Sequence, residues 1–389
     1  MNLKTLNDIT DLNGKKVFVR VDFNVPLDEE GDIIDDKRIR HALPTLNHLL
    51  AHGASQLILA SHLGRPKNNE EHLRTDKVAE KLAELLGEPV EKLDDWGENG
   101  LPEARVVMLE NIRFHTAEKS KDEAERDAFG KQLASLADLY VNEAFSNSHR
   151  KHASMTSIPK FIPAYAGLGV EKEVTAISRA ISDPDHPLVA VIGGLKADKL
   201  TAVRNLMGIA DQVLIAGALA FNLRKEQGHN VGASKVDDEG MSEMGNIVQE
   251  VNASDKVLLP DDAVVADDFS EKANVKTVDI DGIEDGWMAL DIGPKTREKY
   301  LASLTEARTI LWFGPIGVFE MTPFSEGTKV IGNAIADSSA VSIVGGGDSA
   351  SAVKQLGLED KMTLVSTGGG ASLEMIEGKI LPALVVLEK

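Results

Sequence analysis

The fold is decided by runs such as Leu188-Val189-Ala190-Val191-Ile192, which continues directly into Gly193-Gly194. This run is apolar at every position rather than at alternate ones, which is typical of a strand in a parallel sheet covered by helices on both faces. Similar runs recur along the chain. The predicted strands are 17–21, 57–60, 106–109, 139–141, 188–192, 213–216, 257–259, 309–313, 341–344 and 363–365.

Longer amphipathic stretches separate these runs. In 77–86 the residues Val78, Leu82 and Leu85 fall on one stripe, and 123–137 repeats the pattern, so both stretches are predicted to be helices. Because strands and helices alternate, the sheets should be parallel with right-handed crossovers. The predicted fold class is α/β.

The length of 389 residues predicts two domains. A helix-like stretch at 171–181, followed by a segment rich in Asp and Pro, is a plausible mechanical link between them. We therefore predict domains at 1–169 and 186–375, joined by a hinge helix at 170–185. The stretch 380–387 is too apolar for a frayed end and is expected to be packed.

Composition excludes several classes of function. The chain has 42 Lys and Arg against 62 Asp and Glu, a net charge of −20, which argues against nucleic-acid binding because no surplus of cations can displace phosphate counterions. The lack of cysteine excludes disulfides, thiolate metal sites and a cysteine nucleophile. No apolar run is long enough for a membrane span and no signal peptide is recognisable, so a cytoplasmic protein without a membrane partner is expected.

Polar and cationic side chains follow four predicted strands of the first half. Ligands of open α/β sheets bind at the carboxyl ends of strands, so these side chains should share one rim. Guanidinium groups bind oxyanions in bidentate fashion, while carboxylates and amides bind hydroxyls. The rim therefore predicts a site for a small hydroxylated phosphate or carboxylate. The candidates are Asp22, Asn24, Arg38, His62, Arg65, Arg113 and Arg150.

Glycines take the corresponding places in the second half. Val344-Gly345-Gly346-Gly347-Asp348-Ser349 and Ser366-Thr367-Gly368-Gly369-Gly370-Ala371-Ser372 each read as a strand end, a glycine triplet and a serine that is predicted to cap a helix. Such loops let backbone amides approach phosphates, and Asp348 could hold Mg²⁺. Lys196 and Lys199 follow a further Gly pair. No P-loop is present, and phosphoryl transfer between two such sites needs no protein nucleophile.

The ordered set of these segments resembles the phosphoglycerate kinase family. The resemblance extends over effectively the whole chain. The matching segments are 19–26, 61–66, 109–115, 149–154, 291–296, 314–320, 345–349 and 366–372.

The resemblance implies two Rossmann-like lobes that close about a hinge, with 3-phosphoglycerate or 1,3-bisphosphoglycerate on the N-terminal lobe. It also implies a tail, 376–389, that returns to this lobe, and a monomer is expected. Asp22 and Asn24 would bind the glycerate, and Arg38 would neutralise the phosphoryl group in flight. The non-transferred phosphate would be held by His62, Arg65, Arg113 and Arg150, and the substrate-binding set also includes Phe23, Leu63 and Gly64.

The C-terminal lobe would bind ADP or ATP with Mg²⁺. Lys199 and Lys196 would meet the phosphates and the moving group, Glu320 the ribose, and Ala289 with 217–219 the adenine. The nucleotide phosphates would lie at Gly346, Gly347, Asp348 and Ser349, with Asp348 also on the metal.

Four positions depart from the family pattern. Lys196 and Lys199 are separated by two residues instead of three, which on a helix changes their relative direction by about 100°. Phe313 replaces an Asn, Ala289 a Gly, and Glu143 an Asp. Two alternatives to the kinase therefore stay open: another acyl-phosphate kinase, and a non-catalytic or nucleotide-altered paralogue. A NAD-dependent dehydrogenase is disfavoured, because no GxGxxG opens a βαβ unit.

Overall fold

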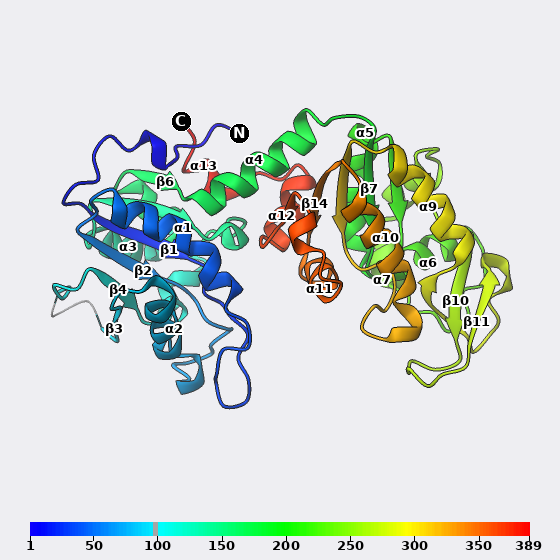
Figure 1. Ribbon diagram of the computed structural model, residues 1–389, viewed down its shortest axis with the longest axis horizontal. Coiled ribbons are helices and arrows are strands. Elements are labelled where there is room, and N and C mark those ends of the chain that lie inside the picture. The colour runs from blue at the N-terminus through cyan, green and yellow to red at the C-terminus, as the bar shows by residue number, and fades with distance from the viewer. Residues whose placement is uncertain (96–99) are drawn as a thin grey trace. The chain divides into compact units, whose positions relative to one another are not determined.

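The computed structural model describes residues 1–95 and 100–389 (Figure 1). The chain divides into two compact units, Met1–Thr175 with Ile380–Lys389, and Ala176–Lys379. The helix α4 (Leu168–Ser182) begins in the first unit and ends in the second. That the first unit binds the glycerate and the second the nucleotide stays a prediction.

The first unit is built on a six-stranded parallel sheet in the order β3-β4-β2-β1-β5-β6. Its central strands are buried throughout apart from Lys16, so both faces of the sheet are covered. The strands are β1 (Lys16–Val21), β2 (Gln56–Ala60), β3 (Glu91–Leu93), β4 (Val106–Leu109), β5 (Leu139–Glu143) and β6 (Ala164–Ala166); the helices between them are α1 (Lys37–Ala51), α2 (Asp76–Leu86) and α3 (Glu123–Ala134).

The second unit contains a six-stranded parallel sheet in the order β15-β14-β13-β7-β8-β9. Its strands are β7 (Leu188–Ile192), β8 (Gln212–Ile215), β9 (Val257–Leu258), β13 (Thr309–Phe313), β14 (Val341–Gly345) and β15 (Leu364–Val365). Its helices are α5 (Leu200–Ile209), α6 (Gly217–Glu226), α7 (Asp238–Glu243), α8 (Gly245–Asn252), α9 (Pro294–Glu306), α10 (Glu326–Asp337), α11 (Gly347–Gln355) and α12 (Gly370–Ile376). The α/β class is thereby confirmed, and each of the predicted strands is present.

A second sheet in this unit was not predicted. It is antiparallel and three-stranded, in the order β11 (Val275–Asp279), β10 (Asp262–Ala266) and β12 (Met288–Ile292). The β11 strand alternates between exposed and half-buried residues, so it lacks the continuous apolar run that marks a parallel strand. Figure 1 shows β10 and β11 lying side by side beyond α6 and α9.

The predicted serine caps are wrong. The residues that precede α11 and α12 are Gly346 and Gly369, and neither helix has a side-chain cap. Gly346 has φ +94° and Gly369 φ +53°, a left-handed backbone that favours glycine. Ser349 and Ser372 lie inside the first turn of α11 and of α12 instead. Ser349 Oγ accepts from Gly314 N (2.6 Å), and Ser372 Oγ lies 2.6 Å from Ser366 Oγ.

The C-terminal segment packs on the first unit. Its helix α13 (Pro382–Val385) is joined to the loop after β5 by a hydrogen bond from Ala383 N to Ser148 O (3.1 Å), and Lys4 N donates to Leu387 O (2.7 Å). Residues 376–379 belong to the second unit, so the tail begins at Ile380 rather than at residue 376. Among the described residues, no helix combines the length and apolar character needed to cross a bilayer.

Candidate functional site

The carboxyl ends of the strands in the first unit gather a set of polar side chains. Asn24 follows β1, and its Oδ1 accepts from Gly64 N (2.7 Å) in the loop after β2. Arg113, which follows β4, donates from Nη1 to Gly64 O (2.8 Å). Three strand ends thus converge on one loop, as the topology of a parallel sheet requires. We define the cationic cluster as residues at these strand ends together with residues from the start of α1 and from the segment after β5: Arg20, Asp22, Asn24, Arg38, His62, Gly64, Arg113, Arg150 and His152.

Arg38 is held in this cluster by an acidic partner. It lies in the first turn of α1 and forms an ion pair with Asp22, whose carboxylate also accepts from Ser146 Oγ. The Arg38 side chain is about one-third exposed (36%), while that of Asp22 is 11% exposed. Arg38 is therefore oriented from within the protein but accessible to an anion outside it.

The histidines of the cluster are neutral. Burial, with Arg20 and Arg113 close by, holds the pKa of His62 well below its usual range. Burial likewise lowers the pKa of His152 to about 3, with Arg20 and Arg113 adding to the effect. Burial and the Arg20 charge lower the pKa of Arg113 to about 10, which still leaves it cationic at neutral pH. Positive charge here comes from arginines, and the histidines offer hydrogen bonds.

Four residues of the predicted substrate-binding set lie outside the group of partly buried, hydrogen-bonded side chains just described. The side chains of Phe23 and Leu63 are buried in the core, so only their backbone could reach a ligand. Their amides are already engaged, Phe23 N with Ser61 Oγ (2.8 Å) and Leu63 N with Asn111 Oδ1 (3.3 Å). Arg65 and Arg150 are exposed. The charge of Arg150 acts on Arg113 and His152, whereas among the described residues no hydrogen bond or ion pair joins Arg65 to the others.

Sequence reasoning did not single out Arg20, Glu118, His152 or Ser154. Arg20 is completely buried in β1 and donates from Nε to Ser154 Oγ (2.8 Å). A charge inside an otherwise apolar strand is a signal that could have identified it, because a buried charge needs a partner. Glu118 and Ser154 are far from Arg20 in the sequence and come together with it only in the folded structure, so no local sequence pattern identifies them.

The second unit contains a cavity of about 700 Å³ at the carboxyl ends of its strands. Apolar side chains and glycines make up most of its wall, as is typical of a small-molecule pocket. It includes three of the predicted residues or segments: Ala289, Glu320 and residues 217–218. The lining residues are Gly194, Leu195, Gly217, Ala218, Phe221, Ala233, Lys235, Phe269, Met288, Ala289, Leu290, Pro315, Gly317, Val318, Glu320 and Met321.

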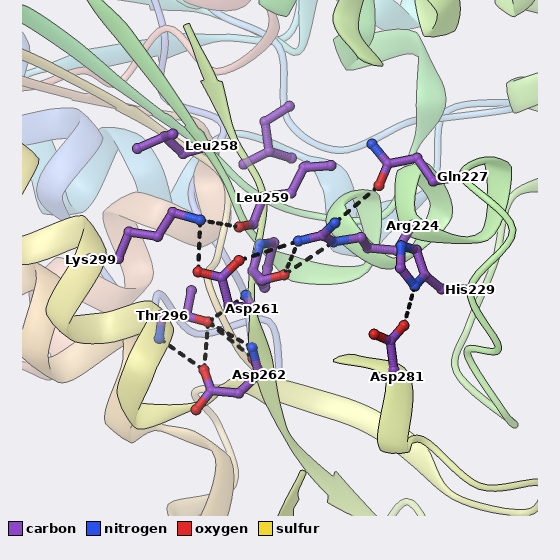
Figure 2. Close-up of polar contacts among 12 residues, drawn as sticks. Arg224, Gln227, His229, Leu258, Leu259, Asp261, Asp262, Asp281, Thr296 and Lys299 are labelled. Atoms are coloured by element: carbon purple, nitrogen blue, oxygen red, sulfur yellow. Dashed lines mark hydrogen bonds and ion pairs between the residues drawn. The ribbon is translucent and has the colours of Figure 1, made fainter. Parts of the chain in front are cut away.

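A polar network joins the elements that carry the lining residues of this cavity (Figure 2). Arg224, near the end of α6, donates from Nε to Pro260 O (3.1 Å), and Lys299 on α9 donates to Leu259 O (3.1 Å) and to Asp261 (2.8 Å). Asp262 at the start of β10 accepts from Thr296 N (2.8 Å). Because α6 begins at Gly217 and β10 pairs with β12, these bonds position both walls of the cavity.

The two lysines of the second unit have different surroundings. Lys199 Nζ donates to Gly193 O (2.6 Å), and a Cβ placed on Gly194 or Gly314 would lie 2.5 or 2.6 Å from that nitrogen. Burial lowers the pKa of Lys199, while the Asp348 carboxylate acts in the opposite direction. Lys196 is exposed and has an extended backbone. The segment Ala197–Lys199 is a single 3₁₀ turn, so the expected 100° rotation along a helix does not apply.

The glycine loop before α11 has the form expected of a phosphate site. Gly347 and Asp348 are exposed in the first turn of α11, where backbone N–H groups are unpaired within the helix and the positive end of the dipole lies. Phe313 is buried, and a Cβ on Gly345 would overlap its ring. Phe313 therefore fills space under the loop and offers no polar group there.

Comparisons with known proteins agree over the full chain. Residues 6–379 match the family model for phosphoglycerate kinase. The chain is 46% identical to the phosphoglycerate kinase of Herpetosiphon aurantiacus and 47% identical to that of Dictyoglomus turgidum, covering 100% of this chain in both cases and 99% and 100% of those proteins.

Solved structures give the same result. The structure of phosphoglycerate kinase from Coxiella burnetii superposes with a TM-score of 0.88 at 37% identity, and that from Pyrococcus horikoshii with 0.84 at 33%. Each comparison covers 99% of this chain and 98% of the solved chain. The chain belongs to the phosphoglycerate kinase family and is a kinase with a carboxyl group as phosphoryl acceptor.

Proposed function

We propose that the first unit binds 3-phosphoglycerate or 1,3-bisphosphoglycerate at the cationic cluster, and that the second binds ADP or ATP at its cavity and glycine loops. In the glycolytic direction, the bond between the carboxyl oxygen of 1,3-bisphosphoglycerate and its phosphorus breaks, and a β-phosphate oxygen of ADP bonds to that phosphorus. The carboxylate of 3-phosphoglycerate is the leaving group. One observation supports this most: cationic side chains gather in one unit, and an apolar cavity with amide-lined loops in the other.

In the first unit, the roles that the family resemblance implies are kept as the proposal. Asp22 and Asn24 bind the glycerate hydroxyl and carboxyl end, and the non-transferred phosphate is bound by His62, Arg65, Arg113 and Arg150. Arg38 exchanges its contact with Asp22 for the transferring phosphoryl group. Its guanidinium neutralises charge that is present only during transfer, so it lowers the barrier rather than tightening substrate binding.

Within the second unit, adenine lies in the cavity against Ala289, and Glu320 binds the ribose. The residues Gly346–Ser349 and Lys199 bind the phosphates. Lys199 is the better placed lysine, because its amine is already fixed among the glycines. Lys196, which is exposed, contributes charge rather than a fixed contact.

Asp348 is proposed to hold Mg²⁺ together with the nucleotide phosphates. Among the described residues, no group of three or more His, Asp or Glu side chains could hold a metal alone. Magnesium is usually held by one or two carboxylates plus substrate phosphates, so a single exposed carboxylate at the phosphate loop fits it. When bound, the ion neutralises phosphate charge; Asp348 positions it from the first turn of α11.

A coupled assay of ATP-dependent phosphorylation tests this proposal. We expect turnover with 3-phosphoglycerate and none with acetate, because the cluster is built for a phosphorylated acceptor. Turnover with acetate would favour another acyl-phosphate kinase. Nucleotide binding without any turnover would favour the paralogue in which Phe313 and Ala289 have altered the site. The expectation of a cytoplasmic monomer is tested by size-exclusion chromatography and cell fractionation.

A further inference from the structure

Glu118 is a completely buried carboxylate beneath the cationic cluster. It lies on the short 3₁₀ helix Thr116–Lys119, and its oxygens accept from Ser154 N (2.9 Å) and Ser154 Oγ (2.6 Å). Burial raises the pKa of the Glu118 carboxyl, whereas Arg20 and Ser154 act in the opposite direction. A buried acid of this kind is costly unless it is paired, so its position among arginines needs a reason.

The contacts of Glu118 continue into the cluster through two residues. Ser154 Oγ donates to Glu118 and accepts from Arg20 Nε (2.8 Å), which uses one donor and one acceptor of the hydroxyl. Arg20 also donates to Val21 O from Nη1, and its Nη2 lies 3.3 Å from His62 Nδ1. A chain of hydrogen bonds therefore leads from Glu118 through Ser154 and Arg20 to His62.

The last contact determines the tautomer of His62. Arginine has only N–H donors at this position, so Nδ1 of His62 must be the acceptor. The ring is neutral, since burial and Arg20 hold the pKa of His62 well below its usual range. Its single proton must then lie on Nε2, which is the only ring atom left to donate a hydrogen bond.

We propose that Glu118 and Ser154 are positioning residues that fix Arg20 and thereby keep His62 as the neutral Nε2–H tautomer, ready to donate to the substrate phosphate. The proposal rests on the proposed function, in which His62 binds that phosphate. Neither Glu118 nor Ser154 is exposed, so they act through Arg20 and His62 rather than by touching the substrate. The other groups that act on the pKa of His62 are Arg113, Arg38 and His152. The two arginines cannot accept a proton from His62, and burial keeps the His152 ring neutral.

The direct test is the ¹⁵N spectrum of the histidine side chains in the full-length protein at pH 7, with His62 assigned by its loss in His62→Gln. In the unsubstituted chain we expect a protonated Nε2 and an unprotonated Nδ1. In Ser154→Ala the Arg20 Nε loses its acceptor, and we expect a mixture of the two tautomers. Ser157→Ala is the matched control, because Ser157 is also buried in Ala153–Ser157 but bonds to Asp127 (2.7 Å) on α3.

The KM values for the two substrates distinguish a positioning role of Ser154 from a general disturbance of the structure. Ser154→Ala should raise KM for 3-phosphoglycerate about tenfold, as expected for the loss of one hydrogen bond to a charged group, and leave KM for ATP unchanged. Ser157→Ala should change neither. Glu118→Gln, which keeps the shape of the side chain, should reproduce the tautomer mixture and the KM effect if Ser154→Ala fails to fold.

Three results would overturn the proposal: a Nδ1–H or doubly protonated His62 in the unsubstituted chain, an unchanged His62 spectrum in folded Ser154→Ala and Glu118→Gln, or an equal rise in KM for both substrates. The spectrum requires no turnover. Failure of the kinase assay with an intact tautomer effect would therefore contradict the proposed function and leave the His62 assignment standing.

Discussion

The two units prepare for anions in different ways. The first uses side-chain charge: Arg38 is held by the Asp22 carboxylate, Arg113 by Gly64 O, and Arg20 by Ser154, whose hydroxyl in turn donates to Glu118. The second is proposed to use backbone: glycines leave room for Lys199 Nζ, which donates to Gly193 O, and further glycines precede α11, where the phosphates are proposed to bind. Substitutions in the first unit should therefore act through charge, and those in the second through charge at Lys199 and through space at the glycines.

The largest effect is expected for Arg38→Ala. If Arg38 stabilises charge mainly during transfer, kcat should fall about a thousandfold, the lower range for an arginine that serves phosphoryl transfer. Binding of Mg-ADP should stay the same, because Arg38 belongs to the other unit. Steady-state kinetics and nucleotide titration measure both, and a kcat within tenfold of the unsubstituted enzyme would remove Arg38 from the transfer step.

The lysines offer a comparison within the second unit. Lys199→Ala should lower kcat/KM for ATP about a hundredfold, since its amine is fixed at the glycines and about 2.7 kcal/mol of charge stabilisation is lost. Lys196→Ala should change it about twofold, as expected for an exposed charge. Equal losses in the two variants would show that both lysines contact the phosphates directly.

Gly194→Ala tests whether the room that a glycine leaves beside Lys199 is needed for nucleotide binding. Gly194 has φ +100°, and an added methyl group would press on Lys199 Nζ, so we expect nucleotide affinity to fall about tenfold. Gly208→Ala is the control, because Gly208 lies in α5 with nothing within 4 Å of an added Cβ. That control should keep its affinity and gain up to about 1 kcal/mol of stability. Unchanged affinity in Gly194→Ala would contradict the proposal that Lys199 Nζ, held beside Gly194, binds the nucleotide.

The last prediction concerns the stability of the first unit rather than ligand binding or turnover. Burial raises the pKa of Glu143 to about 8, although Gly169 N donates to the carboxylate (3.0 Å). Since a glutamate in the unfolded chain has a pKa of about 4.3, the folded state binds this proton more tightly. The stability that Glu143 contributes is therefore full below about pH 4 and is lost as pH rises to about 8.

Glu143→Gln should remove this part of the pH dependence, a slope of at most about 1.4 kcal/mol per pH unit. Urea unfolding between pH 5 and pH 9 measures it. Parallel pH profiles for the variant and the unsubstituted chain would mean that Glu143 titrates normally.

The sequence predicts some strands of the two units better than others. Parallel strands such as 188–192 are visible because burial on both faces makes every position apolar. The β11 strand was missed because its residues are half-exposed or exposed, and β3 because it is a three-residue strand at the sheet edge. Local pattern cannot show such elements.

The same limit applies to the site. Strand-end residues such as Asn24 and Arg113 could be found, because topology brings strand ends together and the structure joins both to Gly64. Ser154 could not, since 134 positions separate it from Arg20. The different surroundings of Lys196 and Lys199 likewise depend on a 3₁₀ turn that the sequence did not reveal.

The central claim is that each unit binds its own ligand with its own chemistry. Calorimetric titration of 3-phosphoglycerate and of Mg-ADP, each alone, into the unsubstituted chain, Arg113→Ala and Lys199→Ala tests it most directly. We predict that Arg113→Ala weakens only 3-phosphoglycerate and Lys199→Ala only Mg-ADP, each about tenfold or more. If either substitution weakens both ligands to the same extent, the division of binding between the units is wrong.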